Sequence, residues 1–266
     1  MKTKRKSTRT ICSKSNTKLI KGEKKKVLSL AIHLAPDRMA GIEFPSVCPK
    51  ATDGCRKACF GGNQSAVGGF RFSRVKAAQI ARTVRFWQNR KGFLLALRGE
   101  LHQHQYHVDL LNAEQEPGED PWLAACRPNT LSDILWENLL DMEGEFPRMK
   151  FYDYTKHSLK TRKNIPSNYH LVYSISEQPG SWAEARRWLD SGRNASMVVG
   201  RRGSSRELDH KAVVAELVAE GEVLGYPCID GDIDDLRFYD GSGKIVLLYP
   251  KGRHARNDRS GFVKLC

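Results

Sequence analysis

The chain has little of what marks a membrane protein or a secreted protein. None of its apolar runs approaches the roughly 20 residues that a helix needs to cross a bilayer. Its N-terminus is basic but lacks the apolar segment that would follow in a secretory signal. The seven cysteines are an odd number, and a chain of 266 residues can build a core without disulfides. We therefore expect a cytoplasmic protein with no membrane partner.

Acidic residues are scarce as well, and the resulting net charge of +14 is unevenly spread. Residues 1–26 carry eleven Lys or Arg and one Glu, that is +10, which leaves +4 on the other 240 residues. Such an arm can neutralise phosphates, or it can be a solvated tail that keeps the protein soluble. We predict a disordered basic tail over 1–26, a single α/β domain over 27–266, and a nucleic acid or nucleotide as partner. The composition does not indicate an oligomeric state.

Strand-like and helix-like segments alternate after residue 26. Short apolar runs of strand length stand at 27–34, 122–126, 149–154, 169–175, 195–199, 226–229 and 245–249. Helical spacing of apolar residues is found at 70–87, 91–106, 132–140, 181–190 and 207–221. Alternation of this kind predicts βαβ units and a parallel sheet of six to seven strands, either a partial (β/α) barrel or an open sheet. A glycine-containing turn within 236–246 predicts a hairpin.

Polar residues follow nearly every predicted strand, at the edge where parallel α/β folds bind ligands. Strands end at the surface in any protein, so each such residue could also be merely solvated. Their joint placement favours one site, with catalytic roles for Asp133, Glu137, Asp153 and Lys156. Asp153 and Lys156 would serve in acid–base or charge-stabilising roles. The expected substrate-binding residues are Arg127, Asn129, Tyr154, Ser174, Glu177, Asp230 and Asp232.

Three of the seven cysteines, Cys48, Cys55 and Cys59, lie within twelve residues in the polar loop after the first strand. The three residues between Cys55 and Cys59 correspond to about one helical turn, so both thiols could face one metal. Thiolates are soft ligands that favour zinc or an iron–sulfur cluster. A structural zinc site takes four protein ligands, and no fourth candidate is adjacent. Three ligands suit a cluster with one open iron, or a catalytic zinc.

The order of strand, three-cysteine loop and helix is similar to that of the radical S-adenosylmethionine enzymes. Those enzymes place three and two residues between their cysteines and an aromatic residue before the last one. Here six and three residues intervene, and Phe60 follows the last cysteine. The expected cofactor is therefore an iron–sulfur cluster, with or without S-adenosylmethionine, or zinc.

Several short motifs of the sequence, taken together, resemble the gene-product-88 type of uncharacterised bacteriophage and plasmid proteins. The resemblance covers roughly residues 27–265 and implies an origin in a phage or mobile element, with nucleic-acid or nucleotide metabolism as the setting. The motifs on which the resemblance rests are the spacing of Cys48, Cys55 and Cys59, the runs Arg127-Pro-Asn-Thr-Leu-Ser-Asp133 and Phe151-Tyr-Asp-Tyr-Thr-Lys156, the run Asn168-Tyr-His-Leu-Val-Tyr-Ser174, and Ile229-Asp-Gly-Asp232 followed by Asp235-Leu-Arg-Phe238.

These observations favour a metal- or iron–sulfur-dependent enzyme that modifies a nucleotide or nucleic acid at the carboxyl ends of its strands. One alternative is a zinc-stabilised DNA-binding protein that uses the basic arm at residues 1–26. Another is a hydrolase or transferase in which zinc at the cysteines activates water.

Overall fold

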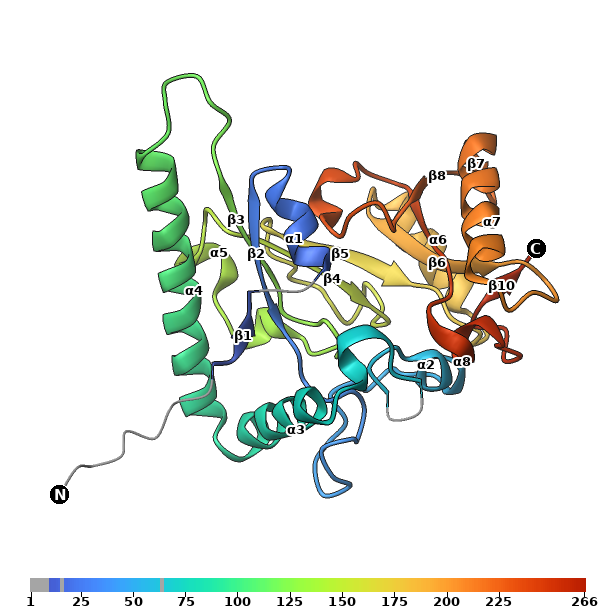
Figure 1. Cartoon of the computed structure of the whole chain (residues 1–266), viewed down its shortest axis with the longest axis horizontal. Helices are drawn as coiled ribbons and strands as arrows, with labels where there is room; N and C mark the ends of the chain where they lie inside the picture. Colours follow the sequence, from blue (N-terminus) through green and yellow to red (C-terminus); the bar gives the residue numbers. More distant parts are fainter. Residues whose placement is uncertain (1–9, 15–16, 63–64) are drawn as a thin grey trace.

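The computed structural model describes residues 10–14, 17–62 and 65–266. A ten-stranded sheet forms its centre, with the order β1-β2-β3-β4-β5-β6-β9-β8-β7 and with β10 paired to β6 (Figure 1). The strands are β1 (Cys12–Ser13), β2 (Val27–Ile32), β3 (Leu123–Arg127), β4 (Lys150–Thr155), β5 (Tyr169–Ser174), β6 (Asn194–Gly200), β7 (Glu222–Val223), β8 (Tyr226–Asp230), β9 (Ile245–Leu248) and β10 (Lys264–Leu265).

The predicted α/β class and the mainly parallel sheet are confirmed. Every neighbouring pair from β2 to β8 along the sheet is parallel, and only the short strands β1 and β7 pair antiparallel with their neighbours. The seven longer strands match the seven predicted apolar runs. The three additional strands have two residues each, which is too short to leave a periodic signal. Within the described residues the sheet stays open rather than closing into a barrel.

Four helices lie where the helical spacing predicts them: α3 (Ser73–Gln88), α4 (Arg90–Ala113), α6 (Ser181–Asp190) and α7 (Glu207–Glu220). Helix α4 runs beyond its predicted end because its buried stripe continues through His104 to Val108. The shorter helices are α1 (Thr17–Glu23), α2 (Asp53–Ala58), α5 (Met142–Glu145) and α8 (Gly252–Arg256). Three 3₁₀ turns complete the set: η1 (Gly68–Arg71), η2 (Trp136–Asn138) and η3 (Arg237–Tyr239).

The sheet separates two apolar layers because successive side chains of a strand point to opposite faces. The larger layer contains Phe151, Leu171 and Met197, and α3, α4, α6 and α7 add their buried side chains to it. The smaller layer joins Tyr152 to Leu236, which comes from the segment just before η3. This arrangement leaves the carboxyl ends of the strands to be covered by loops.

The predicted helix over 132–140 is wrong, since the described chain forms only the 3₁₀ turn η2 there. The amide oxygen of Asn129 accepts hydrogen bonds from the Ser132 hydroxyl, the Ile134 amide and the Trp136 indole. Side-chain bonds of this kind compete with the helical hydrogen bonds of the backbone. They hold the segment as a compact loop at the end of β3.

The predicted hairpin within 236–246 is also wrong. Strands β8 and β9 are parallel, and parallel neighbours need a crossover connection rather than a tight turn. The apolar residues of this segment serve packing instead, because Leu236 is buried against Val27 and Tyr152. Strand β9 consequently inserts between β6 and β8.

The basic segment 1–26 is not disordered where the structure describes it; residues 1–9 and 15–16 lie outside the described residues. Strand β1 pairs with β2, and Ile11 is buried in the larger layer. The ammonium of Lys25 pairs with Asp234 at 2.6 Å, and that of Lys26 pairs with Glu119 at 2.9 Å. For residues 10–14 and 17–26 the predicted disorder is therefore wrong, because the prediction weighed the charge of the segment and overlooked its short apolar stretch.

Candidate functional site

The ends of β4 and β5 bring together three of the predicted site residues. The Lys156 ammonium donates to the Ser174 hydroxyl at 2.6 Å, and the Lys156 amide donates to the Asp133 carboxylate at 2.8 Å. The ammonium also lies 5.3 Å from the centre of the Phe262 ring. The half-buried ammonium of Lys156 therefore lies at the carboxyl-end edge of the sheet, between a hydroxyl and a ring face, and the backbone of Lys156 is bound by Asp133.

Glu177, just after β5, is bound to the helix that carries Cys55. Its carboxylate accepts hydrogen bonds from the Gly54 amide and the Thr52 hydroxyl, each at 2.8 Å. Thr52 in turn accepts from the Cys55 amide at 3.1 Å, as the N-cap of α2. Burial opposes ionisation of Glu177, but these hydrogen bonds and Lys156 outweigh it and lower the pKa of its carboxyl group. Glu177 thereby fixes the cysteine helix to the end of β5.

The thiols of Cys48, Cys55 and Cys59 lie close enough together to influence one another electrostatically. Burial is the main cause that raises the pKa of Cys48, and the neighbouring thiols Cys59 and Cys55 add to it. Burial also raises the pKa of Cys59 to about 11, although amide hydrogen bonds from Gly61 and Gly62 and the charge of Lys156 oppose it. Of the thiols in the loop after β2, that of Cys59 thus feels the charge of Lys156.

The present side-chain positions do not form a coordination sphere. The Cys48 thiol donates to the Leu131 carbonyl at 3.2 Å and accepts from the Asp37 amide at 3.3 Å. Across residues 10–14, 17–62 and 65–266, no three His, Cys, Asp or Glu side chains are placed so that they could hold a metal ion. The donor chemistry of three neighbouring thiols suits a soft metal, but binding one would require Cys48 to leave Leu131 and the thiols to lose their protons.

Asp153, Asn129 and Arg127 form a buried network inside the edge of the sheet. The Asp153 carboxylate accepts hydrogen bonds from the backbone N–H of Asn129 and from the Tyr169 hydroxyl, each at 2.9 Å. It also lies 3.7 Å from the Arg127 guanidinium. Burial raises the pKa of Asp153 to about 8, against the opposing effect of Arg127 and these hydrogen bonds. Asp153 is fully enclosed, so its contacts support the loop after β3 rather than face a ligand.

Asp133 and Glu137 share a partner that the sequence did not reveal, Arg162. Its guanidinium binds both carboxylate oxygens of Glu137, at 3.0 and 2.8 Å, and one oxygen of Asp133 at 3.0 Å. It also donates to the Thr155 hydroxyl at 3.1 Å. Arg162 lies in a loop with no periodic pattern, so only the tertiary structure identifies it.

Asp230 and Asp232 form a second group, around the ends of β8 and β9, and Tyr154 belongs to neither group. The Asp230 carboxylate accepts from the Asp232 amide at 2.7 Å, and the Asp232 carboxylate pairs with Lys251 and accepts from the Tyr249 amide at 3.1 Å. Tyr154 is turned toward the smaller apolar layer, where the Arg127 guanidinium lies 5.1 Å from its ring centre.

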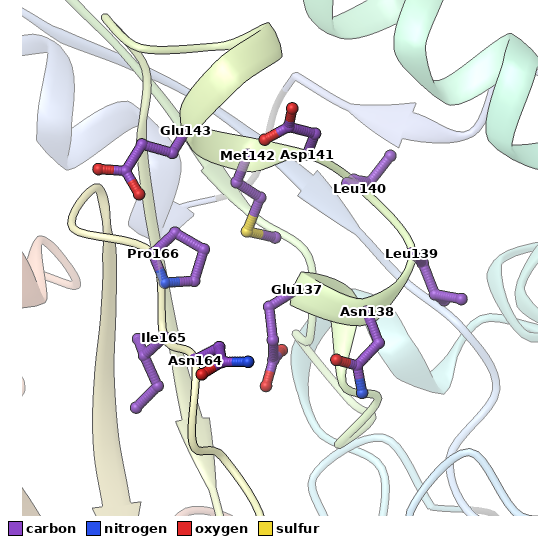
Figure 2. Close-up of a pocket in the computed structure, with 10 residues that line it drawn as sticks. All are labelled: Glu137, Asn138, Leu139, Leu140, Asp141, Met142, Glu143, Asn164, Ile165 and Pro166. Atoms are coloured by element: carbon purple, nitrogen blue, oxygen red, sulfur yellow. The ribbon is translucent and has the colours of Figure 1, made fainter.

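Two hollows open on the surface. One, of about 550 Å³, lies between the segments 137–143 and 164–166, and Glu137 is the predicted site residue on its wall (Figure 2). The other, of about 470 Å³, lies beyond the ends of β5 and β6 and has mainly apolar walls. Trp182 and Met197 belong to those walls, and Glu177 and Lys264 supply charge. This second hollow shares Glu177 with the anchor of the cysteine helix.

No described helix is long and apolar enough to cross a membrane. Comparison with curated proteins gives no match, and neither does comparison with solved structures. One family model, described as gene product 88, matches residues 10–265. That range includes the cysteine loop, every strand of the sheet and the whole carboxyl-end edge. The chain therefore belongs to the gene product 88 family.

Proposed function

We propose that this protein is an enzyme whose site is the edge formed by Cys48, Cys55, Cys59, Asp133 and Lys156. It would act on a nucleotide or nucleic acid and would use a metal centre bound by the three thiols. The observation that carries the proposal is the grouping of three thiols that influence one another electrostatically, with Cys59 also influenced by the half-buried Lys156, at the edge where parallel sheets bind ligands.

The electrostatics of the thiols support a bound metal over free reactive cysteines. Because burial raises the pKa of Cys48 and Cys59, these two thiols stay protonated and are poor nucleophiles without a metal. Three thiolates leave a fourth coordination position open, as in iron–sulfur clusters with an exposed iron and in catalytic zinc sites. A cluster would supply one-electron chemistry and zinc would activate water. We favour the cluster, with or without S-adenosylmethionine, because its ligands need not form a closed tetrahedron.

The protein's own side chains have separate tasks in this proposal. Lys156 would bind an anionic group such as a phosphate, since its ammonium is fixed by Ser174 and flanked by the Phe262 ring. Glu177 would keep α2 in place through Gly54 and Thr52. The hollow of about 470 Å³ next to Glu177 has the size of a small-molecule site, and its apolar walls suit a flat ring such as a base.

Metal analysis of protein purified without oxygen tests the proposal. We expect iron and sulfide, with visible absorption, or zinc in the alternative case. The variants Cys48→Ser, Cys55→Ser and Cys59→Ser should each lose the metal, whereas Cys266→Ser, which changes an exposed thiol outside the loop, should retain it. Protein that contains none of these metals after anaerobic reconstitution would refute the metal centre. Equal loss in the Cys266→Ser control would refute its assignment to this loop.

The alternative of a zinc-stabilised DNA-binding protein with a basic arm has less support. In the described part of the arm, Lys25 and Lys26 pair with carboxylates of the body, and Lys21 donates to the carbonyls of Asp232 and Ile233. These three cations hold the segment against the sheet and are not available to phosphates in this conformation.

A further inference from the structure

Exposed cations gather on the elements that surround the cysteine helix. Lys57 lies on α2, and Arg253 and Arg259 lie on and just after α8. The two helices pack together through Ala58 and Ala255 (Figure 1). The cations of both helices are therefore carried by two neighbouring elements, one of which also carries Cys55.

An exposed aromatic residue extends this surface at the start of α3. Phe72 is 57% exposed and stands between the exposed cations Arg71 and Arg74. The neighbouring Phe70 packs on Phe60, two residues after the end of α2, with ring centres 5.7 Å apart. An exposed aromatic ring costs solvation free energy in a monomer, so its position between two cations points to a ligand with flat rings and negative charge.

The segments that carry the two parts of the surface contact each other. The backbone of Gly252, the first residue of α8, approaches Val67 so closely that a Cβ atom at this position would collide with the Val67 side chain. Val67 directly precedes η1, which leads into Phe72. Lys57, Arg71, Phe72, Arg74, Arg253 and Arg259, here called the basic-aromatic surface, thus lie on segments that contact one another next to the cysteine helix.

Among the described residues, most cations of this surface lack the ion pairs that neighbouring arginines of the same helices make. Arg56 pairs with Asp37 and Asp53, and Arg256 pairs with Glu207. Within the part of the chain that the structure describes, Lys57, Arg74, Arg253 and Arg259 have no such carboxylate partner. Their charge remains available to a polyanion.

We propose that the basic-aromatic surface binds a single-stranded nucleic acid, with phosphates on its cations and a base stacked on Phe72. This inference rests on the proposed function and names the macromolecular substrate of the same edge. Cations along a surface bind the phosphate backbone, and exposed rings stack on bases that a duplex would hide. An acidic peptide would use the cations but would gain little from the aromatic ring.

Fluorescence anisotropy with labelled oligonucleotides tests the surface. Single-stranded DNA and RNA serve as probes, with a duplex of the same sequence as comparison. Phe72→Ala should weaken single-strand binding by roughly tenfold, because one stacked base is lost, and Phe72→Trp should preserve it. The matched control is Leu95→Ala, which removes another exposed apolar side chain, 73% exposed, on α4.

The charges are tested by salt dependence. Replacing Lys57, Arg253 and Arg259 together by Glu should lower the slope of log affinity against log salt by about 2, since each lost phosphate contact contributes about 0.7 for single strands. The control variant replaces three cations outside the surface, Lys24, Lys150 and Arg186, together by Glu. It should leave the slope closer to that of the wild type. Equal losses in both triple variants would show a non-specific effect of net charge and would overturn the proposal.

Two further outcomes separate this inference from the proposed function. Tighter binding of the duplex, or an unchanged affinity of Phe72→Ala, would refute stacking on this surface while leaving the metal content untouched. Conversely, loss of the metal in Cys55→Ser with intact oligonucleotide binding would support the surface independently of the metal. If removal of residues 1–9 abolished binding and the surface variants did not, the N-terminal arm would be the true binding element.

Discussion

At the scale of single residues, Arg162 joins three side chains at the edge of the sheet. Its side chain is fully enclosed and joins Glu137, Asp133 and the hydroxyl of Thr155. Taking these charges out of water costs several kcal/mol for each ion, so each member depends on the others for compensation. Asp133 and Glu137 therefore keep their positions through a residue that lies 25 or more positions further along the chain.

We predict that Arg162→Ala lowers the free energy of unfolding by about 3–5 kcal/mol, because it leaves two carboxylates without their cation. Urea denaturation measures the change. The control is Arg187→Ala, which breaks the exposed pair with Glu184 and should cost only about 0.2–1 kcal/mol. Similar losses in the two variants would contradict the buried network.

At the scale of the elements, the placement of α2 depends on a distant residue. A helix of six residues is too short to form on its own. Thr52 caps its first turn, and Glu177, more than 120 positions away, holds Thr52 and Gly54. The cysteine loop therefore has a defined geometry only when β5 is in place.

Glu177→Gln should loosen this helix, because an amide group offers one acceptor oxygen where the carboxylate offers two. We expect the Gly54 and Cys55 amides to exchange hydrogen roughly 5–30-fold faster, equivalent to about 1–2 kcal/mol. Hydrogen-exchange mass spectrometry or NMR measures this. Glu184→Gln on α6, which alters a different carboxylate anchor, should leave exchange in 53–59 unchanged.

The same anchor predicts a pH dependence. Since the folded state lowers the pKa of Glu177, the anchor is complete above the ordinary pKa of glutamate and is lost as the pH falls through the lower, folded value. Exchange of α2 in the wild type should then approach that of Glu177→Gln in acid. A constant difference between the two proteins at all pH values would contradict the role of the carboxylate.

For the whole molecule, residues 10–14 are part of the fold, and β1 forms the edge of the sheet beside β2. Ile11 is buried and β1 pairs with β2. We predict that Ile11→Ala costs about 2–4 kcal/mol of unfolding free energy, as for other buried large-to-small changes. Ile20→Ala on α1, where the side chain is 50% exposed, should cost under about 1 kcal/mol. Thermal and urea unfolding compare them, and a neutral Ile11→Ala would support the disordered tail instead.

The sequence alone determined the class of the fold, the seven long strands, four of the helices and the presence of polar residues after the strands, at their carboxyl-end edge. These follow from local periodicity, because burial on one or both faces of a strand or helix leaves its pattern in neighbouring residues. The alternation of the segments then implied parallel pairing. The grouping of Cys48 with Cys55 and Cys59 was likewise visible, since the three cysteines are close in the chain.

Only the tertiary structure decided which side chains meet at that edge. It joined Lys156 to Ser174, Glu177 to α2, and Arg162 to Glu137, and it inserted β9 between β6 and β8. It also converted the predicted helix at 132–140 into a loop around Asn129. Such contacts join residues far apart in the chain, and their free energy depends on the burial of both partners. No local pattern predicts these contacts, because the sequence around each partner gives no sign of which distant residue it will meet.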